Sequence, residues 1–241
     1  MSPAGAGGSG LVVTVAGEPA PIHCDALLFD MDGTLVDSRE CVERKWRAWC
    51  ARHGLDAEAL LRRSHGRQLA DTVRLAAPHL DLDREVTDLV RWEERDTTGL
   101  VPVPGAVDLL AALPADRWAV VTSAWRRLAE IRLGHVGLPV PACLVTADDV
   151  GRGKPAPDGY LAAAARLGHP PGRCVVLEDS RVGVRAGRAA GMWVIGVATT
   201  VAPSRLDADR VVRDLSVVRV DRAVSPRVDG APAAGARATP G

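Results

Sequence analysis

The sequence predicts an α/β fold in which a doubly wound, mostly parallel, Rossmann-like sheet carries an inserted all-helical cap. Three observations predict it. Short apolar runs such as residues 26–29 do not alternate with polar residues, which is typical of strands buried on both faces of a parallel sheet. From residue 106 onward such runs alternate with helical patterns. Residues 38–101 instead contain several helical patterns and no strand pattern.

These patterns divide the chain of 241 residues into four parts. Residues 1–22 are rich in Gly, Ala and Pro and are predicted to be disordered, with an edge strand over 11–16 as the alternative. Residues 23–37 and 102–221 form the predicted core domain, and 38–101 form the helical cap domain. The Pro-, Ala- and Gly-rich tail, 222–241, is again predicted to be disordered.

The cap elements follow from apolar spacing and from capping residues. Ser38 is a candidate N-cap for a helix over 40–53, in which apolar residues recur at helical spacing and which Gly54 ends. Asp56 is placed to cap a short second helix that runs to Arg63. After a polar loop over 64–67, helical patterns return over 68–77 and 83–97.

The core elements alternate regularly along the chain. After the first strand, the predicted strands cover residues 118–121, 143–145, 174–177 and 193–197, with one more short edge strand within 210–220. The predicted helices between them cover residues 106–113, 126–133, 158–167 and 181–190. Parallel strands joined in this way end at the same edge of the sheet, where ligands bind in such folds.

Composition excludes several classes of protein. Lys plus Arg and Asp plus Glu are both 30, so no overall field attracts nucleic acid or an anionic membrane. The five cysteines are scattered without a C-x-x-C pair, which argues against a disulfide framework and for a reducing, cytoplasmic compartment. No apolar stretch is long enough to span a membrane, and the N-terminus lacks the basic region of a signal peptide.

Polar residues follow the predicted strands at the point where each strand ends. Asp30 and Asp32 follow the first strand, and the others lie after later strands or in the loops beyond them: Thr122, Ser123, Lys154, Glu178 and Asp179. Two carboxylates as close as Asp30 and Asp32 repel each other and need a cation or a shared proton. Mg²⁺ takes oxygen ligands and commonly bridges to substrate phosphate, so these acids suggest a magnesium site.

Two other kinds of binding motif are excluded because residues that they require are absent. A calcium-binding loop starting at Asp30 needs Gly at its sixth position and Glu at its twelfth, where this chain has Leu35 and Cys41. A nucleotide-binding P-loop around Lys154 needs Gly and Ser or Thr at two positions that Asp148 and Pro155 occupy.

With these motifs in place, the chain resembles the haloacid dehalogenase-like superfamily of phosphohydrolases over residues 25–220. Its four motifs appear in the family's order: D-x-D-G-T at 30–34, an apolar strand ending in Thr at 120–122, Lys-Pro at 154–155 and an acidic pair at 178–179. The helical segment after the first motif is similar to the family's mobile cap. The resemblance implies Mg²⁺-dependent hydrolysis of phosphate monoesters.

The resemblance also implies a role for each motif residue. Asp30 is the expected nucleophile, which becomes an aspartyl-phosphate, and Asp32 is the expected general acid and then base. Thr122, with Ser123 beside it, is expected to bind a phosphate oxygen, and Lys154 to balance charge on nucleophile and phosphate. The expected Mg²⁺ ligands are Asp30, the backbone carbonyl of Asp32, and Asp179, with Glu178 as a further ligand or a supporting acid.

Single residues separate the activities within this superfamily. Asp32 argues against the dehalogenases, which lack the second aspartate. Phosphonatases use a cap lysine, and the cap's lysine here, Lys45, is expected to be solvated on its helix. A β-phosphoglucomutase-type sugar phosphomutase remains the alternative, although Val42 stands near the place of its cap histidine. A binding module that keeps the fold without catalysis is the remaining alternative.

The cap loop Ser64-His65-Gly66-Arg67-Gln68 resembles a stretch in sugar phosphatases close to the glycerol-phosphate and 2-deoxyglucose-6-phosphate phosphatases. The resemblance implies that His65 and Arg67 reach the substrate when the cap closes, and the alternative is an ordinary polar loop. The expected partner is therefore a small phosphorylated sugar or polyol, and neither nucleic acid nor a membrane is expected. The protein itself is expected to be a monomer.

Overall fold

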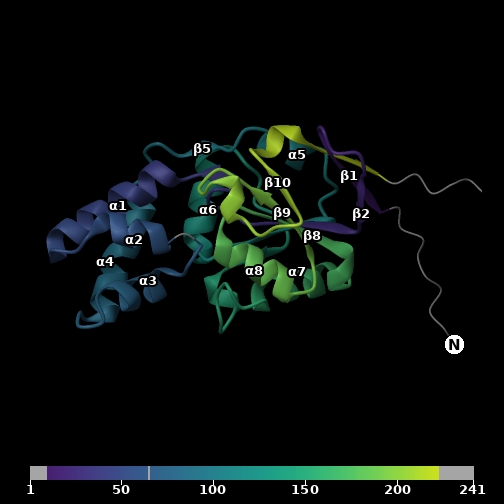
Figure 1. The fold of residues 1–241 in the computed structure, drawn as a ribbon. Coiled ribbons are helices and arrows are strands. Elements are labelled where there is room, and N and C mark those ends of the chain that lie inside the picture. The colour runs from purple at the N-terminus through teal and green to yellow at the C-terminus, as the bar shows by residue number, and fades with distance from the viewer. Residues whose placement is uncertain (1–9, 65, 223–241) are drawn as a thin grey trace, which may run out of the picture.

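The structure is a computed structural model that describes residues 10–64 and 66–222. Its centre is a parallel six-stranded sheet in the order β10-β9-β8-β3-β6-β7, with helices on both faces (Figure 1). The strands are β3 (Ala26–Phe29), β6 (Trp118–Val121), β7 (Leu144–Val145), β8 (Cys174–Glu178), β9 (Trp193–Val197) and β10 (Arg210–Val212). The first of these in the chain, β3, lies in the middle, and the connections run outward from it in both directions. The doubly wound α/β prediction is confirmed.

The apolar runs form central strands because successive side chains are buried on opposite faces. Leu27 and Phe29 face one hydrophobic core, which includes α5 (Ala106–Ala111) and α6 (Arg126–His135). Leu28 faces the other core, which includes α7 (Asp158–Leu167) and α8 (Arg181–Ala189). Since neither face meets water, every position of β3 is apolar and buried.

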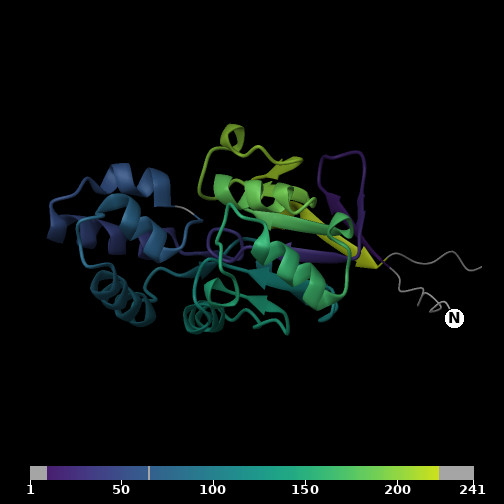
Figure 2. The same ribbon diagram turned by 90° about the horizontal axis from the view of Figure 1, so that it is seen from below.

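Four helices between β3 and the rest of the sheet form a separate layer with its own core (Figures 1 and 2). They are α1 (Arg39–His53), α2 (Ala57–Ser64), α3 (Leu69–Ala76) and α4 (Leu82–Arg95). Trp46 and Trp49 pack edge to face at 5.6 Å in their centre. The two-stranded ribbon of β4 (Val36–Asp37) and β5 (Val101–Pro102) joins this layer to the sheet.

The cap helices α1 and α2 begin at the residues predicted to cap them, and α1 also ends where predicted. Gly54 ends α1 in the left-handed conformation, with φ of 65°, and Asp56 caps α2 by accepting a hydrogen bond from the backbone N–H of Ala59. Ser38 is the N-cap residue of α1, as predicted, but its side chain makes no capping hydrogen bond.

The N-terminal segment corrects the predicted disorder over residues 1–22. Residues 11–15 form β1 (Leu11–Val15), which pairs antiparallel with β2 (Ile22–Cys24) and with β11 (Val218–Arg222) in a separate three-stranded sheet. Its alternate side chains join the core, because period-two burial places Leu11, Val13 and Val15 on one face. The edge strand given as the alternative is therefore present, and residues 1–9 lie outside the described residues.

The C-terminal part differs from the single edge strand predicted within 210–220. It contains two strands, β10 in the parallel sheet and β11 in the small sheet. A 3₁₀ turn over Leu215–Val217 separates them, and Leu215 is fully buried. Residues 223–241, the rest of the predicted disordered tail, lie outside the described residues.

Shortening a core side chain of β1 is expected to destabilise the protein. Leu11→Ala should reduce the free energy of unfolding by about 2–4 kcal/mol, because Leu11 is 1% exposed and its removal leaves a cavity. Thr14→Ala, on the exposed face of the same strand, should change it by less than about 0.5 kcal/mol. Urea unfolding measures both; equal, small effects would show that β1 contributes nothing to the folded core.

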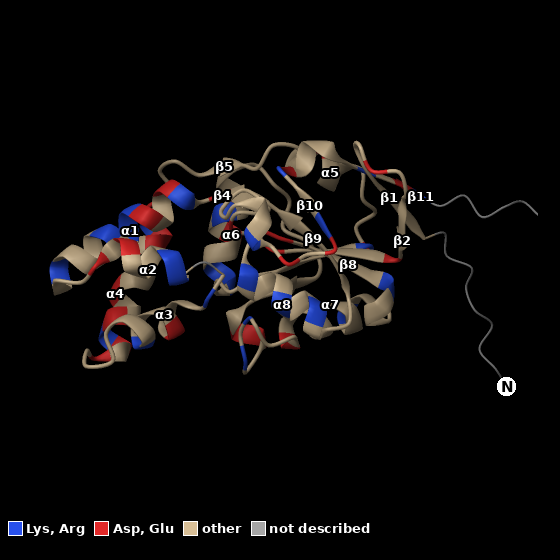
Figure 3. Ribbon diagram, in the orientation of Figure 1, with Lys and Arg blue, Asp and Glu red and all other residues tan. Residues whose placement is uncertain are grey.

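Lys and Arg alternate with Asp and Glu along the helices of the ribbon (Figure 3). All five cysteines are buried and unpaired. Within the part of the chain that the structure describes, no helix combines the length and the apolar character that crossing a bilayer requires.

Candidate active site

The carboxyl ends of three neighbouring strands place the predicted site residues side by side. Asp30 follows β3, Thr122 follows β6, and Glu178 and Asp179 lie at the end of β8. Because β6 and β8 pair with β3 on either side, these residues meet at the edge where the connections diverge. All four are buried.

Lys154 reaches this edge from the loop before α7, and its ammonium lies between two acids. Its Nζ donates to Asp30 Oδ1 at 2.5 Å, to Glu178 Oε1 at 2.7 Å and to the carbonyl oxygen of Val121 at 3.0 Å. Thus all three protons of the ammonium have an acceptor. Lys154 and Asp30 are 124 residues apart in the sequence, so this hydrogen bond joins two of the predicted motifs directly.

Glu178 is held firmly on the far side of Lys154. Its Oε1 also accepts from the Tyr160 hydroxyl at 3.2 Å, and its Oε2 accepts from the backbone N–H and the hydroxyl of Ser180. The carboxylate lies against Gly183, where a Cβ atom would overlap it. A glycine at position 183 is therefore needed for the Glu178 side chain to occupy this place.

Asp179 lies on the other side of the cluster. Its Oδ2 accepts from the hydroxyl of Thr200 at 2.5 Å. Gly33, with φ of 90°, passes so close that a side chain there would overlap the Asp179 carboxylate, which explains the glycine of the first motif. Thr199 donates to the carbonyl oxygen of Gly33 and fixes that turn.

The cluster holds more negative charge than Lys154 balances. Burial, together with the neighbouring Glu178, raises the pKa of Asp30 from 3.8 to about 7, although Lys154 opposes this. Burial and the carboxylates of Glu178 and Asp30 also raise the pKa of Asp179 well above its usual range. Burial would lower the pKa of Lys154, but the attraction of Asp30 and Glu178 outweighs it and raises that pKa. The site therefore favours an additional cation or proton.

This excess charge predicts how stability depends on pH. Asp30 has a higher pKa in the folded protein, so the folded state binds more protons, and stability should fall as pH rises from about 4 to about 7. A shift of this size corresponds to about 4 kcal/mol. Urea unfolding of metal-free protein across this range measures it, and Asp30→Asn should flatten the profile. An unchanged profile in that variant would exclude Asp30 as the cause.

The residues present fit a hard divalent cation. Asp30, Glu178 and Asp179 each offer a carboxylate oxygen, and these oxygens lie within 4.8 Å of one another. Oxygen donors of this kind suit Mg²⁺. Because both Glu178 oxygens already accept hydrogen bonds, Asp30 and Asp179 are the freer donors.

Thr122 and Ser123 occupy two different positions at the end of β6. The Thr122 hydroxyl accepts from the backbone N–H of Ala124 at 3.1 Å and lines the same pocket as Asp30. The Ser123 hydroxyl donates to the carbonyl oxygen of Gly66 in the cap, at 2.9 Å. Ser123 therefore contacts the cap loop, whereas the Thr122 hydroxyl stays on the core side of the pocket that both residues line.

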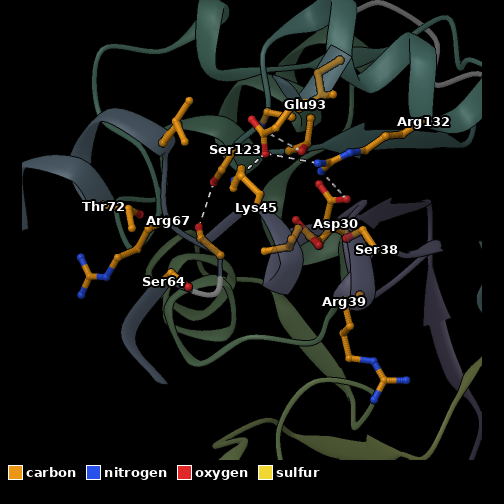
Figure 4. A pocket seen from close by; sticks show the side chains of 18 of the residues that line it. Asp30, Ser38, Arg39, Lys45, Ser64, Arg67, Thr72, Glu93, Ser123 and Arg132 are labelled. Atoms are coloured by element: carbon orange, nitrogen blue, oxygen red, sulfur yellow. Dashed lines mark hydrogen bonds and ion pairs between the residues drawn. The ribbon is translucent and has the colours of Figure 1, made fainter. Parts of the chain in front are cut away.

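The pocket beside Asp30 lies between the sheet and the cap, with a volume of about 100 Å³ (Figure 4). Arg67 lines it from the cap loop and donates through Nε to the carbonyl oxygen of Arg63. His65 lies outside the described residues. Val42 also lines the pocket.

Asp32 lies apart from the Lys154 cluster and forms an ion pair with Arg132 of α6, at 2.7 Å. The other end of the Arg132 guanidinium contacts Glu93 of α4 at 3.3 Å, and Glu93 accepts from Lys45 of α1 at 2.6 Å. Lys45 is thus buried and paired, and the prediction that it is solvated was wrong. Burial lowers its pKa, and Glu93 opposes that shift.

Several residues around the site were not identified from the sequence. Thr200 follows β9, so the rule of polar residues at strand ends applies to it as well. Tyr160 is the chain's single tyrosine, yet nothing local indicated its contact with Glu178. Arg132 and Glu93 lie within ordinary amphipathic helices among many charged residues, and only the packing of α4 beside α6 distinguishes them.

Comparison with known proteins agrees with this geometry. Residues 24–191 match the family model described as haloacid dehalogenase-like hydrolase. Hexitol phosphatase A from Escherichia coli is 42% identical over 207 residues, which cover 83% of this chain and 96% of the relative. Glycerol-1-phosphate phosphohydrolase 2 from Saccharomyces cerevisiae is 36% identical over 199 residues, which cover 76% of this chain and 78% of the relative.

Among solved structures, a hydrolase from Pseudomonas syringae superimposes with a TM-score of 0.73 at 27% identity, covering 80% of this chain and 94% of that one. The region that matches the family model includes β3, β6, β7 and β8 of the parallel sheet, the four-helix insert and the carboxylate cluster. The chain belongs to the haloacid dehalogenase-like hydrolase family.

Proposed function

We propose that the protein is a Mg²⁺-dependent phosphatase that hydrolyses small sugar or polyol phosphates through an aspartyl-phosphate on Asp30. The observation that carries this proposal is the buried cluster of Asp30, Lys154, Glu178 and Asp179 beside a small pocket. Two relatives support the substrate class, since they are named for hexitol phosphate and glycerol 1-phosphate.

In this proposal Asp30 attacks the phosphorus atom of the substrate. A new bond forms between Asp30 and phosphorus, the phosphorus–oxygen ester bond breaks, and its electron pair goes to the departing alkoxide. Asp32 gives that oxygen a proton, then accepts one from the water that splits the aspartyl-phosphate and returns Asp30. Two steps of this kind replace a hydrolysis that is extremely slow without catalysis.

The charged residues around Asp30 have complementary tasks. Lys154 is fixed against Asp30 by three hydrogen bonds, so it reduces repulsion between the nucleophile and an incoming phosphate. Thr122 offers a hydroxyl to a phosphate oxygen. Asp30, Asp179 and the carbonyl oxygen of Asp32 would hold Mg²⁺, which neutralises phosphate charge when bound. Glu178, saturated with hydrogen bonds, would position Lys154 rather than bind the ion directly.

Release of inorganic phosphate from a panel of sugar and polyol phosphates tests this function. Rapid release that requires Mg²⁺ and stops on chelation supports it. Conversion of a hexose 1-phosphate to the 6-phosphate with little free phosphate would instead identify a phosphomutase. No reaction on any member of the panel would favour a binding module.

We also propose that α1–α4 act as a cap whose loop around Arg67 helps to select the substrate. Arg67 lines the pocket but makes no contact with the carboxylate cluster, so its removal should affect binding more than chemistry. Arg67→Ala should raise KM for a hexitol phosphate about tenfold and KM for 4-nitrophenyl phosphate by less than threefold. Steady-state kinetics measure both values, and equal changes would remove Arg67 from substrate selection.

A further inference from the structure

Four charged side chains of alternating sign run from the core of the protein into the cap. Figure 4 labels three of them, Arg132, Glu93 and Lys45. Asp32 contacts Arg132 at 2.7 Å, Arg132 contacts Glu93 at 3.3 Å, and Glu93 contacts Lys45 at 2.6 Å. We call this set the ion-pair chain. Every member lines the pocket beside Asp30, and one end of the chain is the proposed general acid.

The ion-pair chain crosses the boundary between the two layers at a single point. Asp32 and Arg132 belong to the core, and Glu93 and Lys45 belong to the cap helices α4 and α1. The side chains of Arg132, Glu93 and Lys45 are only 4%, 6% and 4% exposed. Removing such charges from water is expensive and gives little net stability, so their burial here calls for another role.

Arg132 is the link through which the two ends act on each other. One nitrogen of its guanidinium contacts Asp32 and another contacts Glu93, and the planar group is rigid. A shift of the cap that moves Glu93 therefore moves or releases the guanidinium. Asp32, whose side chain is 27% exposed, would then lose the charged group that holds its carboxylate in place.

We propose that Arg132 is a positioning residue for Asp32, and that Glu93, backed by Lys45, sets Arg132 only when the cap is docked on the core. This rests on the proposed function, in which Asp32 protonates the departing oxygen. With the chain formed, Arg132 holds the Asp32 carboxyl at the pocket that it lines; with the chain broken, the carboxyl loses this support and proton transfer to the departing oxygen slows. The ion-pair chain thus makes acid catalysis conditional on cap docking.

A neighbouring acid provides the matched control. Glu94 also crosses from α4 to the core, where it accepts from Trp125 Nε1 at 3.3 Å and forms an ion pair with Arg127 at 3.2 Å. Within residues 10–64 and 66–222, no ion pair joins Glu94 to Arg132. Glu94→Gln removes an ion pair with the exposed Arg127 and keeps an acceptor for Trp125, so the cap stays docked and the ion-pair chain stays intact. Glu93→Gln instead breaks the chain at its middle.

The test measures kcat/KM for three phosphate monoesters whose organic groups carry no hydroxyl: 4-nitrophenyl, phenyl and benzyl phosphate. Their leaving groups are increasingly basic and so depend increasingly on protonation. Glu93→Gln should lower kcat/KM less than threefold on 4-nitrophenyl phosphate and about tenfold or more on benzyl phosphate. Glu94→Gln should leave all three values within about twofold of the wild type. Wild-type turnover of the same compounds establishes the phosphatase activity independently.

Two outcomes would overturn the proposal. An equal loss on all three compounds in Glu93→Gln would assign Glu93 to cap docking alone. No loss on benzyl phosphate, together with a loss on a hexitol phosphate measured beside it, would assign Glu93 to binding substrate hydroxyls.

A second variant covers the case in which Glu93→Gln alone does not fold. The double variant Lys45→Met with Glu93→Gln removes both charges of the buried cap pair, which avoids leaving the Lys45 ammonium unpaired. It should show the same steepened dependence on the leaving group. A double variant with the wild-type dependence would contradict the proposal.

Discussion

Asp30→Asn is expected to abolish turnover, with a fall in kcat of ~10⁴-fold or more, while the protein stays folded. The amide keeps the shape of the side chain but cannot attack phosphorus. It also removes one of the buried negative charges that raise the pKa of Asp179, so the fold should tolerate it. Phosphate release and circular dichroism measure the two parts of this prediction.

Asp148→Asn is the matched control, because Asp148 also follows a parallel strand but is exposed and accepts from the backbone N–H of Arg126. It should keep kcat within about twofold of the wild type. Substantial turnover by folded Asp30→Asn protein would rule out covalent catalysis by this residue.

Lys154→Met should damage both stability and activity. The ammonium is the cation in direct contact with Asp30 and Glu178, and its loss leaves these buried acids unpaired. Breaking a buried pair in this way typically costs about 3–5 kcal/mol. We expect unfolding at a correspondingly lower urea concentration without metal and a fall in kcat of ~10²-fold or more, because repulsion between Asp30 and phosphate is no longer reduced.

Arg152→Met, two residues earlier in the same loop, is the control. Arg152 forms an exposed ion pair with Asp158, and such a pair contributes less than about 1 kcal/mol. Millimolar Mg²⁺ should restore more stability to Lys154→Met than to the wild type, since the added cation meets more unbalanced charge. Equal stabilisation of the two proteins would argue against a shared electrostatic site.

The sequence was most informative where local pattern and tertiary burial agree. The strand Ala26–Phe29 is apolar on every side chain, and in the structure both faces of it are buried. The helix Asp158–Leu167 and the strand Trp193–Val197 match their predicted bounds. For strand β1 the main prediction was disorder, because the glycine-rich residues around it resemble a disordered segment. The strand is stabilised by pairing with β11, more than 200 residues away, which no local pattern shows.

For the site, one rule found most of the cluster: parallel strands end at one edge of a sheet. It places Asp30, Thr122 and Asp179 together, and their contacts with Lys154 and Thr200 then follow from the loops that return to this edge. The rule gives nothing about Arg132 and Glu93, because both are on helices that meet only when the cap packs on the core. Similarly, Lys45 resembled a solvated helix residue until its partner on α4 was known.

The most direct test of the covalent mechanism uses Asp32→Asn with 4-nitrophenyl phosphate and Mg²⁺. This leaving group needs no protonation, but without the base the aspartyl-phosphate should persist. After an acid quench, peptide mass spectrometry should find one phosphoryl group on the peptide that contains Asp30, in step with a burst of 4-nitrophenol. A burst with no phosphoryl group on that peptide, or with the group on another residue, would contradict the account.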